Sequence, residues 1–150
     1  MREKFNEALK TAMKAGDKRQ VSTLRLINAA IKDRDIEARG AGKERATDEE
    51  ILALLQKMIK QRNDSIEQFD KAGRTDLSTQ EREEKAIIES YLPKQMNADE
   101  VRAAAKAAVA AVGAASVKDM GKVMTELKSK YAGQMDFSKA NAVVKELLTT

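Results

Sequence analysis

Apolar residues recur along this chain with the three- to four-residue spacing of amphipathic helices, and polar residues fill the intervals. Val21, Leu24, Ile27 and Ile31 form one such stripe. The same spacing returns twice near the end of the chain, at Val117, Met120, Met124, Leu127 and Tyr131, and at Phe137, Ala140, Val144 and Leu147. No stretch alternates apolar and polar residues between turn residues, as a half-buried strand would. The pattern predicts an all-α protein.

Glycines and capping residues mark the ends of these helices. Glycine is the favoured residue just past a helix, and five glycines each close an apolar stretch: Gly16, Gly40, Gly73, Gly113 and Gly133. Side chains that cap helix starts precede later stretches: Thr47, Ser78, Asn97 and Ser116. These marks predict helices over residues 3–15, 18–38, 48–72, 79–91, 98–112, 117–132 and 137–148.

The single proline divides this set of helices. Pro93 ends the fourth helix, because a proline disfavours the α conformation at the residue before it. We therefore expect an N-terminal four-helix domain over residues 1–92, followed by a small C-terminal three-helix bundle over residues 93–150. The second domain is near the lower size limit for independent folding.

The composition narrows the chemistry. The 150 residues contain no Cys and no His, which excludes a zinc finger, a thiol nucleophile, a disulfide scaffold and an imidazole base. A catalytic role would need carboxylates, Lys, Ser or Tyr, or another chain. We expect no catalytic residue, no cofactor and no metal ligand in this chain.

The sequence also argues against a membrane protein. Its first ten residues are charged throughout, unlike a signal peptide. The least polar stretch, residues 101–116, is short and contains two basic residues, so it does not predict a bilayer span. We expect a cytoplasmic protein with no membrane partner.

The net charge of +4 is unevenly distributed. Residues 1–92 carry 19 basic and 18 acidic side chains, whereas residues 93–150 carry 9 and 6. The last two predicted helices hold most of this excess, at Lys118, Lys122, Lys128, Lys130 and Lys139. Such residues fit sequence-independent contacts with a phosphate backbone, and a solvated helix surface is the alternative. Aromatic residues are scarce, which disfavours recognition of single strands by base stacking.

Gly121 lies inside the sixth predicted helix, where glycine costs about 1 kcal/mol relative to alanine. One interpretation is a close helix crossing in a small bundle. The other is the close approach of a phosphate backbone beside Lys118, Lys122 and Lys128. The sequence alone favours the helix crossing.

A polar cluster on the third predicted helix and the turn after it forms a second candidate surface. Its basic members are Lys60, Arg62 and Arg74. Ion pairing on a helix surface would explain them, and a partner-facing surface is the alternative.

Four motifs carry a resemblance to a known family: residues 60–69 (KQRNDSIEQF), 72–77 (AGRTDL), 91–95 (YLPKQ) and 119–124 (DMGKVM). In this order they resemble the YqeY-like family of GatB/YqeY domain proteins over nearly the whole chain. That family is similar to the helical and tail domains of the GatB component of the aspartyl/glutamyl-tRNA amidotransferase. The resemblance implies an all-helical, two-part protein.

The resemblance also implies a tRNA partner, because the tail of GatB is associated with holding tRNA. Gly121 and Lys122 match the tail motif directly. We add the other tail lysines, at 118, 128, 130 and 139, to the candidate tRNA-binding residues because of their charge and their proximity to this motif. The phosphorylating domain and the amidase component of that enzyme have no counterpart here, so a carbon–nitrogen ligase activity with glutamine as amido-N-donor would belong to the related complex.

Three hypotheses therefore remain open at this stage. The first is a tRNA-binding, non-catalytic module that works with translation or tRNA-amidation proteins. The second is a protein-interaction adaptor that uses the highly charged first four helices. The third is an enzyme, alone or as an accessory of the amidotransferase.

Overall fold

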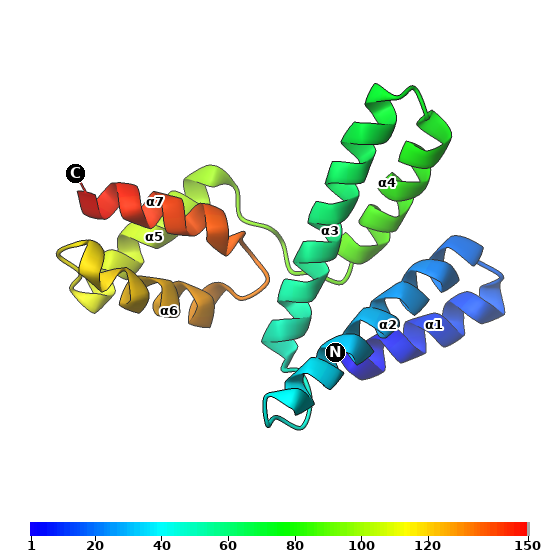
Figure 1. Cartoon of the computed structure of the whole chain (residues 1–150), viewed down its shortest axis with the longest axis horizontal. Coiled ribbons are helices and arrows are strands. Elements are labelled where there is room, and N and C mark those ends of the chain that lie inside the picture. The colour runs from blue at the N-terminus through cyan, green and yellow to red at the C-terminus, as the bar shows by residue number, and fades with distance from the viewer. Residues whose placement is uncertain (150) are drawn as a thin grey trace. The chain divides into compact units, whose positions relative to one another are not determined.

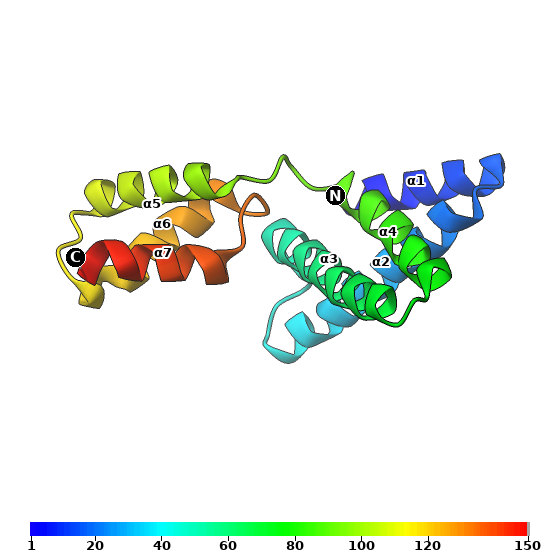
Figure 2. The ribbon, with the colours of Figure 1, turned by 90° about the horizontal axis from the view of Figure 1, so that it is seen from above.

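A computed structural model describes residues 1–149 of the chain. Over this range the chain forms α-helices and one short 3-10 turn, without a strand, which confirms the all-α prediction. It divides into two compact units, Met1–Leu92 and a second that begins at Pro93. Figure 1 and Figure 2 show the ribbon from two directions. Independent folding of the two units stays a prediction.

The first unit consists of two helical hairpins (Figure 1). Helix α1 (Arg2–Ala15) packs along α2 (Lys18–Gly40), and α3 (Asp48–Lys71) packs along α4 (Thr75–Glu89). Apolar side chains from all four helices form one core, in which the following are fully buried: Phe5, Leu24, Ile27, Ile51, Leu55 and Ile88. Leu24 and Ile27 belong to the apolar stripe from which the sequence analysis predicts the second helix.

Local capping explains where the helices of the first unit begin. The side chain of Asp17 accepts a hydrogen bond from the backbone N–H of Gln20 at 3.1 Å. Thr47 does the same for Glu50, also at 3.1 Å. Each bond satisfies a donor that the first helical turn leaves without a partner. Gly16 has a φ of 69°, a left-handed conformation that lets the chain reverse between α1 and α2.

The fourth helix begins earlier than the sequence analysis predicts, at Thr75 instead of residue 79. Gly73, with a φ of 71°, reverses the chain on its own, and the N–H of Arg74 bonds back to the carbonyl of Phe69 at 2.8 Å. No further connecting residues are needed, so Ser78 is not a cap. It is buried in the first turns of α4, and its hydroxyl donates to the carbonyl of Thr75.

The second unit consists of α5 (Ala98–Val112), the 3-10 turn η1 (Val117–Asp119), α6 (Met120–Tyr131) and α7 (Phe137–Thr149). Its core contains these buried side chains: Ala104, Ala105, Ala108, Val123, Leu127, Met135, Ala140 and Val144. The many alanines of α5 are small, which lets neighbouring helices approach closely. Asn97 and Glu100 form a reciprocal capping box at the start of α5, with bonds of 2.8 and 3.2 Å.

The start of the sixth helix differs from the prediction. Val117 is placed on the apolar stripe by its spacing, yet it lies in the 3-10 turn and is 41% exposed. A 3-10 turn has three residues per turn, so the register of this first turn differs from that of the α-helix after it. The apolar face of α6 therefore begins at Met120 and includes the fully buried Val123.

Candidate nucleic-acid interface

The candidate interface lies on α6 and on the turn that leads into it. Asp119 fixes this turn, because its carboxylate accepts the backbone N–H groups of Ala115 at 2.9 Å and Ser116 at 3.3 Å. These backbone bonds, with a smaller contribution from the charge of Lys122, hold the pKa of Asp119 below its ordinary value. The carboxylate is thus occupied by the backbone, and it orders the residues around Lys118.

One face of α6 combines lysines with a residue that has no side chain. Lys122 and Thr125 lie on the side of α6 opposite the buried residues, Gly121 and Lys128 border that side, and Lys118 lies in the 3-10 turn just before α6. All five residues are exposed. We call these five residues the α6 face. Its three lysines are those that the sequence analysis places beside Gly121.

The lysines of the α6 face keep their charge available. None of Lys118, Lys122 and Lys128 forms an ion pair within residues 1–149. Two acids lie three or four residues from Lys122, Asp119 in the 3-10 turn and Glu126 in α6, and each is engaged elsewhere. Asp119 accepts backbone N–H groups, and Glu126 pairs with Lys130 at 2.9 Å.

The close helix crossing favoured for Gly121 is wrong. Apart from its two chain neighbours and the nearby backbone of its own helix, no atom of the described residues lies within 4 Å of a Cβ at this position. No neighbouring helix there needs the missing side chain, and glycine costs helix stability without a gain in packing. The backbone is open to solvent, and Thr125 Oγ1 donates to the Gly121 carbonyl at 2.8 Å.

The remaining two tail lysines lie apart from the α6 face. Lys130 is on another side of α6, where its ion pair with Glu126 raises its pKa. Lys139 is exposed in the first turn of α7, a different helix. The predicted set therefore divides into one compact group and two outlying residues.

The sequence analysis misses the role of Gln95. Its side-chain amide donates to the carbonyl of Gly133 at 2.6 Å and to that of Pro93 at 2.9 Å. The N–H of Met96 adds a bond to the carbonyl of Gln134 at 2.8 Å. These bonds tie the segment before α5 to the loop between α6 and α7. In the sequence, the position of this glutamine two residues after the only proline is the one feature that could have indicated its role.

The second candidate surface does not form one patch. Arg62 is mostly buried, with its Nε 3.3 Å from the carboxylate of Glu84, which is itself buried between α3 and α4. Arg74 is exposed at the start of α4, and its guanidinium pairs with both oxygens of Asp76 at 3.2 and 3.3 Å. This pairing lowers the pKa of Asp76. Lys60 is exposed, but a spacing of two residues puts it on a different side of α3 from Arg62.

A groove of about 680 Å³ runs between α2 and α3 in the first unit. Its floor is apolar and consists of small or medium side chains, including Ala29, Ala30, Ala53 and Leu54. Charged residues of both signs also line the groove: Asp33, Arg34, Glu37, Glu50, Lys57 and the mostly buried Arg62. Leu26, at one end of the groove, is 44% exposed. The groove combines an apolar floor with charged residues, as does a surface that binds a protein segment.

Within residues 1–149, none of the helices combines the length and the apolar character needed to cross a bilayer.

Comparison with known proteins gives matches to fungal proteins named "Altered inheritance of mitochondria protein 41, mitochondrial". The one from Lachancea thermotolerans is 40% identical over 99 residues, which cover 65% of this chain and 51% of the relative. The one from Pyrenophora tritici-repentis is 36% identical over 83 residues, 55% of this chain and 44% of the relative. Their names place those relatives in mitochondria, and a cytoplasmic location for this chain stays a prediction.

This chain spans about half the length of these curated relatives. The family match covers much more of it. The sequence profile of the family described as "Yqey-like protein" matches residues 2–148, from the first residue of α1 to the penultimate residue of α7. The chain belongs to the YqeY-like family.

Proposed function

We propose that this protein is a non-catalytic, tRNA-binding module that contacts the tRNA backbone through the α6 face. The observation that carries the proposal is the open glycine among three lysines without ion pairs in the described residues. A phosphate backbone can approach Gly121 closely because no side chain covers it, while Lys118 and Lys122 supply positive charge beside it. Membership of the YqeY-like family supports this assignment.

The kind of contact follows from the side chains present. Lysine presents a compact charge that binds phosphate without reading a base, so binding through this face depends on the fold of the RNA and on its backbone. The five residues of the α6 face include no aromatic side chain to stack on an unpaired base. The proposed partner is therefore a folded RNA such as tRNA, within a cytoplasmic translation or tRNA-amidation assembly.

The experiment is a titration of labelled tRNA with the full chain, followed by fluorescence anisotropy at several salt concentrations. Changing Lys118, Lys122 and Lys128 to Glu should weaken binding strongly. It should also reduce the slope of log affinity against log salt by about two to three, because each phosphate contact contributes about 0.9. Binding that is absent in the unchanged protein, or indifferent to these substitutions, would refute the proposal.

A matched control changes three lysines of the first unit to Glu, at Lys57, Lys71 and Lys85. This variant has the same net charge as the α6 variant, and all three positions lie on α3 or α4. Its tRNA affinity should stay within a few-fold of the unchanged protein. An equal loss in both variants would show that only the overall charge matters.

A protein-interaction adaptor is the second candidate, and the α2–α3 groove is the observation that favours it. Affinity capture from cell extract after nuclease treatment would distinguish it from the first. Protein partners that survive nuclease, and that are lost when Ala53 is changed to Glu on the groove floor, would support an adaptor. An accessory role in glutamine-dependent amidation would instead change the rate at which the amidotransferase modifies mischarged tRNA.

A further inference from the structure

The first unit is nearly neutral as a whole, but its two hairpins carry opposite charge. Residues 1–40, which contain α1 and α2, have ten basic and six acidic side chains. Residues 41–92, which contain α3 and α4, have nine basic and twelve acidic side chains. The α1–α2 hairpin therefore has a net charge of +4 in 40 residues, a higher density than that of the second unit.

Three of these cations form a regular row on α2. Lys18, Arg25 and Lys32 stand seven residues apart, which corresponds to nearly two helical turns, so they share one exposed face. None of the three forms an ion pair within residues 1–149. Asp17 and Asp35 lie close to this row in the sequence, and both are engaged: Asp17 accepts the backbone N–H of Gln20, and both oxygens of Asp35 are bound by the guanidinium of Arg2 at 2.6 Å.

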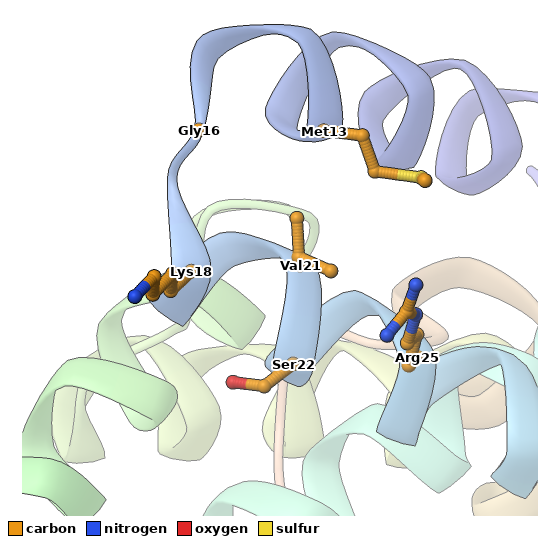
Figure 3. Close-up of a pocket in the computed structure, with 6 residues that line it drawn as sticks. All are labelled: Met13, Gly16, Lys18, Val21, Ser22 and Arg25. Atoms are coloured by element: carbon orange, nitrogen blue, oxygen red, sulfur yellow. The ribbon is translucent and has the colours of Figure 1, made fainter.

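An apolar cleft of about 410 Å³ lies beside this row, between the end of α1 and the start of α2. In Figure 3, Met13 of α1 and Val21 of α2 extend into the space between the two helices, and Lys18 and Arg25 flank them. Met13 is 54% exposed, an unusually open position for a large apolar side chain. The described residues that line the cleft include no acid.

A second, smaller cleft of about 260 Å³ continues along the same two helices toward the start of α1. Its lining includes Asn6 of α1 with Asn28 and Lys32 of α2. The row of cations thus borders both clefts. From Lys18 to Lys32 it extends for about 21 Å, or close to four turns of an α-helix.

We propose that the α1–α2 hairpin is a docking surface for an acidic amphipathic α-helix of a partner protein. The seven-residue repeat matches a helix whose carboxylates recur once per heptad, as in pairs of packed helices. An apolar side chain of that helix enters the cleft between Met13 and Val21. The carboxylates on its flank then meet Lys18, Arg25 and Lys32.

A nucleic acid fits this surface less well. The charges of a duplex follow one another at about 3.4 Å along each strand, which does not match cations about 10 Å apart. A phosphate backbone also has no apolar group to fill the cleft at Met13. The α6 face differs in this respect, because its centre is an exposed backbone and not an apolar side chain.

The experiment measures binding of a fluorescent, alanine-based 21-residue helical peptide to the full chain by anisotropy. The peptide has one glutamate per heptad, which matches the spacing of the row, and one central leucine. Changing Lys18, Arg25 and Lys32 to Glu should weaken binding about tenfold or more, since three attractive pairs become repulsive. Met13→Ser should weaken it about fivefold, because the exposed half of a Met side chain no longer becomes buried.

Two controls separate this surface from general effects. A variant with Lys57, Lys106 and Lys145 changed to Glu has the same net charge, with all three positions exposed elsewhere, and should bind as the unchanged protein does. The variant of the α6 face should also bind normally, which makes this test independent of tRNA binding. All three substitutions of the row are on exposed side chains, and Lys18→Glu puts a favourable negative charge at a helix start.

Several outcomes would overturn the proposal. One is equal binding of a peptide with glutamine in place of glutamate. Another is binding of the acidic peptide that does not change when the row is reversed. Loss of duplex RNA binding in the row variant, without any peptide binding, would assign the surface to nucleic acid. A dimer of the unchanged protein that the row variant abolishes, again without peptide binding, would assign it to a second copy of this chain.

Discussion

Replacing Gly121 by alanine separates the two explanations for a glycine inside α6. Alanine is favoured over glycine in a helix interior by about 1 kcal/mol. Apart from its chain neighbours and the nearby backbone of its own helix, the added methyl group meets no atom of the described residues within 4 Å, so no steric cost offsets this gain. We expect the second unit to gain about 1 kcal/mol in its free energy of unfolding. We also expect weaker tRNA binding, because the methyl group covers the backbone between Lys118 and Lys122.

Gly113→Ala in the same unit is the matched control. A Cβ at Gly113 also meets nothing within 4 Å apart from its chain neighbours, but this residue has a φ of 66° after the end of α5. Alanine in the left-handed conformation costs about 1–2 kcal/mol. The same chemical change in equally open space should therefore stabilise the second unit at position 121 and destabilise it at position 113.

Amide hydrogen exchange at Val123 and Leu127, both fully buried in the core of the second unit, measures the two effects. A gain of about 1 kcal/mol slows exchange through global opening about fivefold. Faster exchange in Gly121→Ala would refute the reasoning, because it would mean that a neighbouring group occupies that space. Slower exchange with unchanged tRNA affinity would support the helix-propensity argument but would refute a role for Gly121 in RNA contact.

Three further substitutions test the first unit. Glu84→Gln leaves the buried Arg62 without its counter-charge and should lower the free energy of unfolding in urea by about 3 kcal/mol. The control Glu83→Gln changes an exposed side chain and should cost less than about 1 kcal/mol. Equal costs would contradict the importance of the buried pair. The guanidinium bound to Asp35 lowers the pKa of that carboxyl from 3.8 to about 2, so about 2 kcal/mol of stability is present above pH 4 and is lost as the pH falls through 2. Asp35→Asn should therefore lower the thermal midpoint at pH 7 and flatten its acid dependence, and parallel pH profiles would argue against this pairing. Thr23→Val should raise the free energy of unfolding by about 1 kcal/mol, because the buried hydroxyl has no hydrogen-bond partner in the described structure. A lower thermal midpoint in this variant would disprove the prediction.

Apolar spacing, together with the glycines and caps between the stripes, predicts that there are seven helices and roughly where they lie, because these signals are properties of each helix's own residues. Caps such as Thr47 and Asn97 also fix helix starts, since a cap bonds to an N–H only two or three residues away. The errors occur where two local signals compete. Ser78 has the residue type of a cap, but Gly73 already reverses the chain, and Val117 has helical spacing but lies in a 3-10 turn.

Ion pairing within the fold, and not the number of basic residues, decides which cations remain available to bind a partner. The Glu126–Lys130 pair follows from a spacing of four residues and is readable from the sequence. The Arg62–Glu84 pair joins residues on two helices, so only the folded hairpin reveals it. The first unit as a whole has a net charge of only +1, because the acidic α3–α4 hairpin offsets most of the charge of the basic α1–α2 hairpin.

This offset between the two hairpins has a physical limit, because exposed charges more than about 8 Å apart are largely screened at physiological salt. An acid on α4 therefore does little to neutralise Arg25 on the outer face of α2 unless the two side chains meet. Arg25 has no such partner within residues 1–149. In contrast, Arg19 on another side of the same helix pairs with Glu83 of α4 at 3.0 Å. Partner binding at the α1–α2 hairpin should accordingly weaken as the salt concentration rises, to the extent expected for three ion pairs with the partner. This salt dependence is expected although the unit as a whole is almost uncharged.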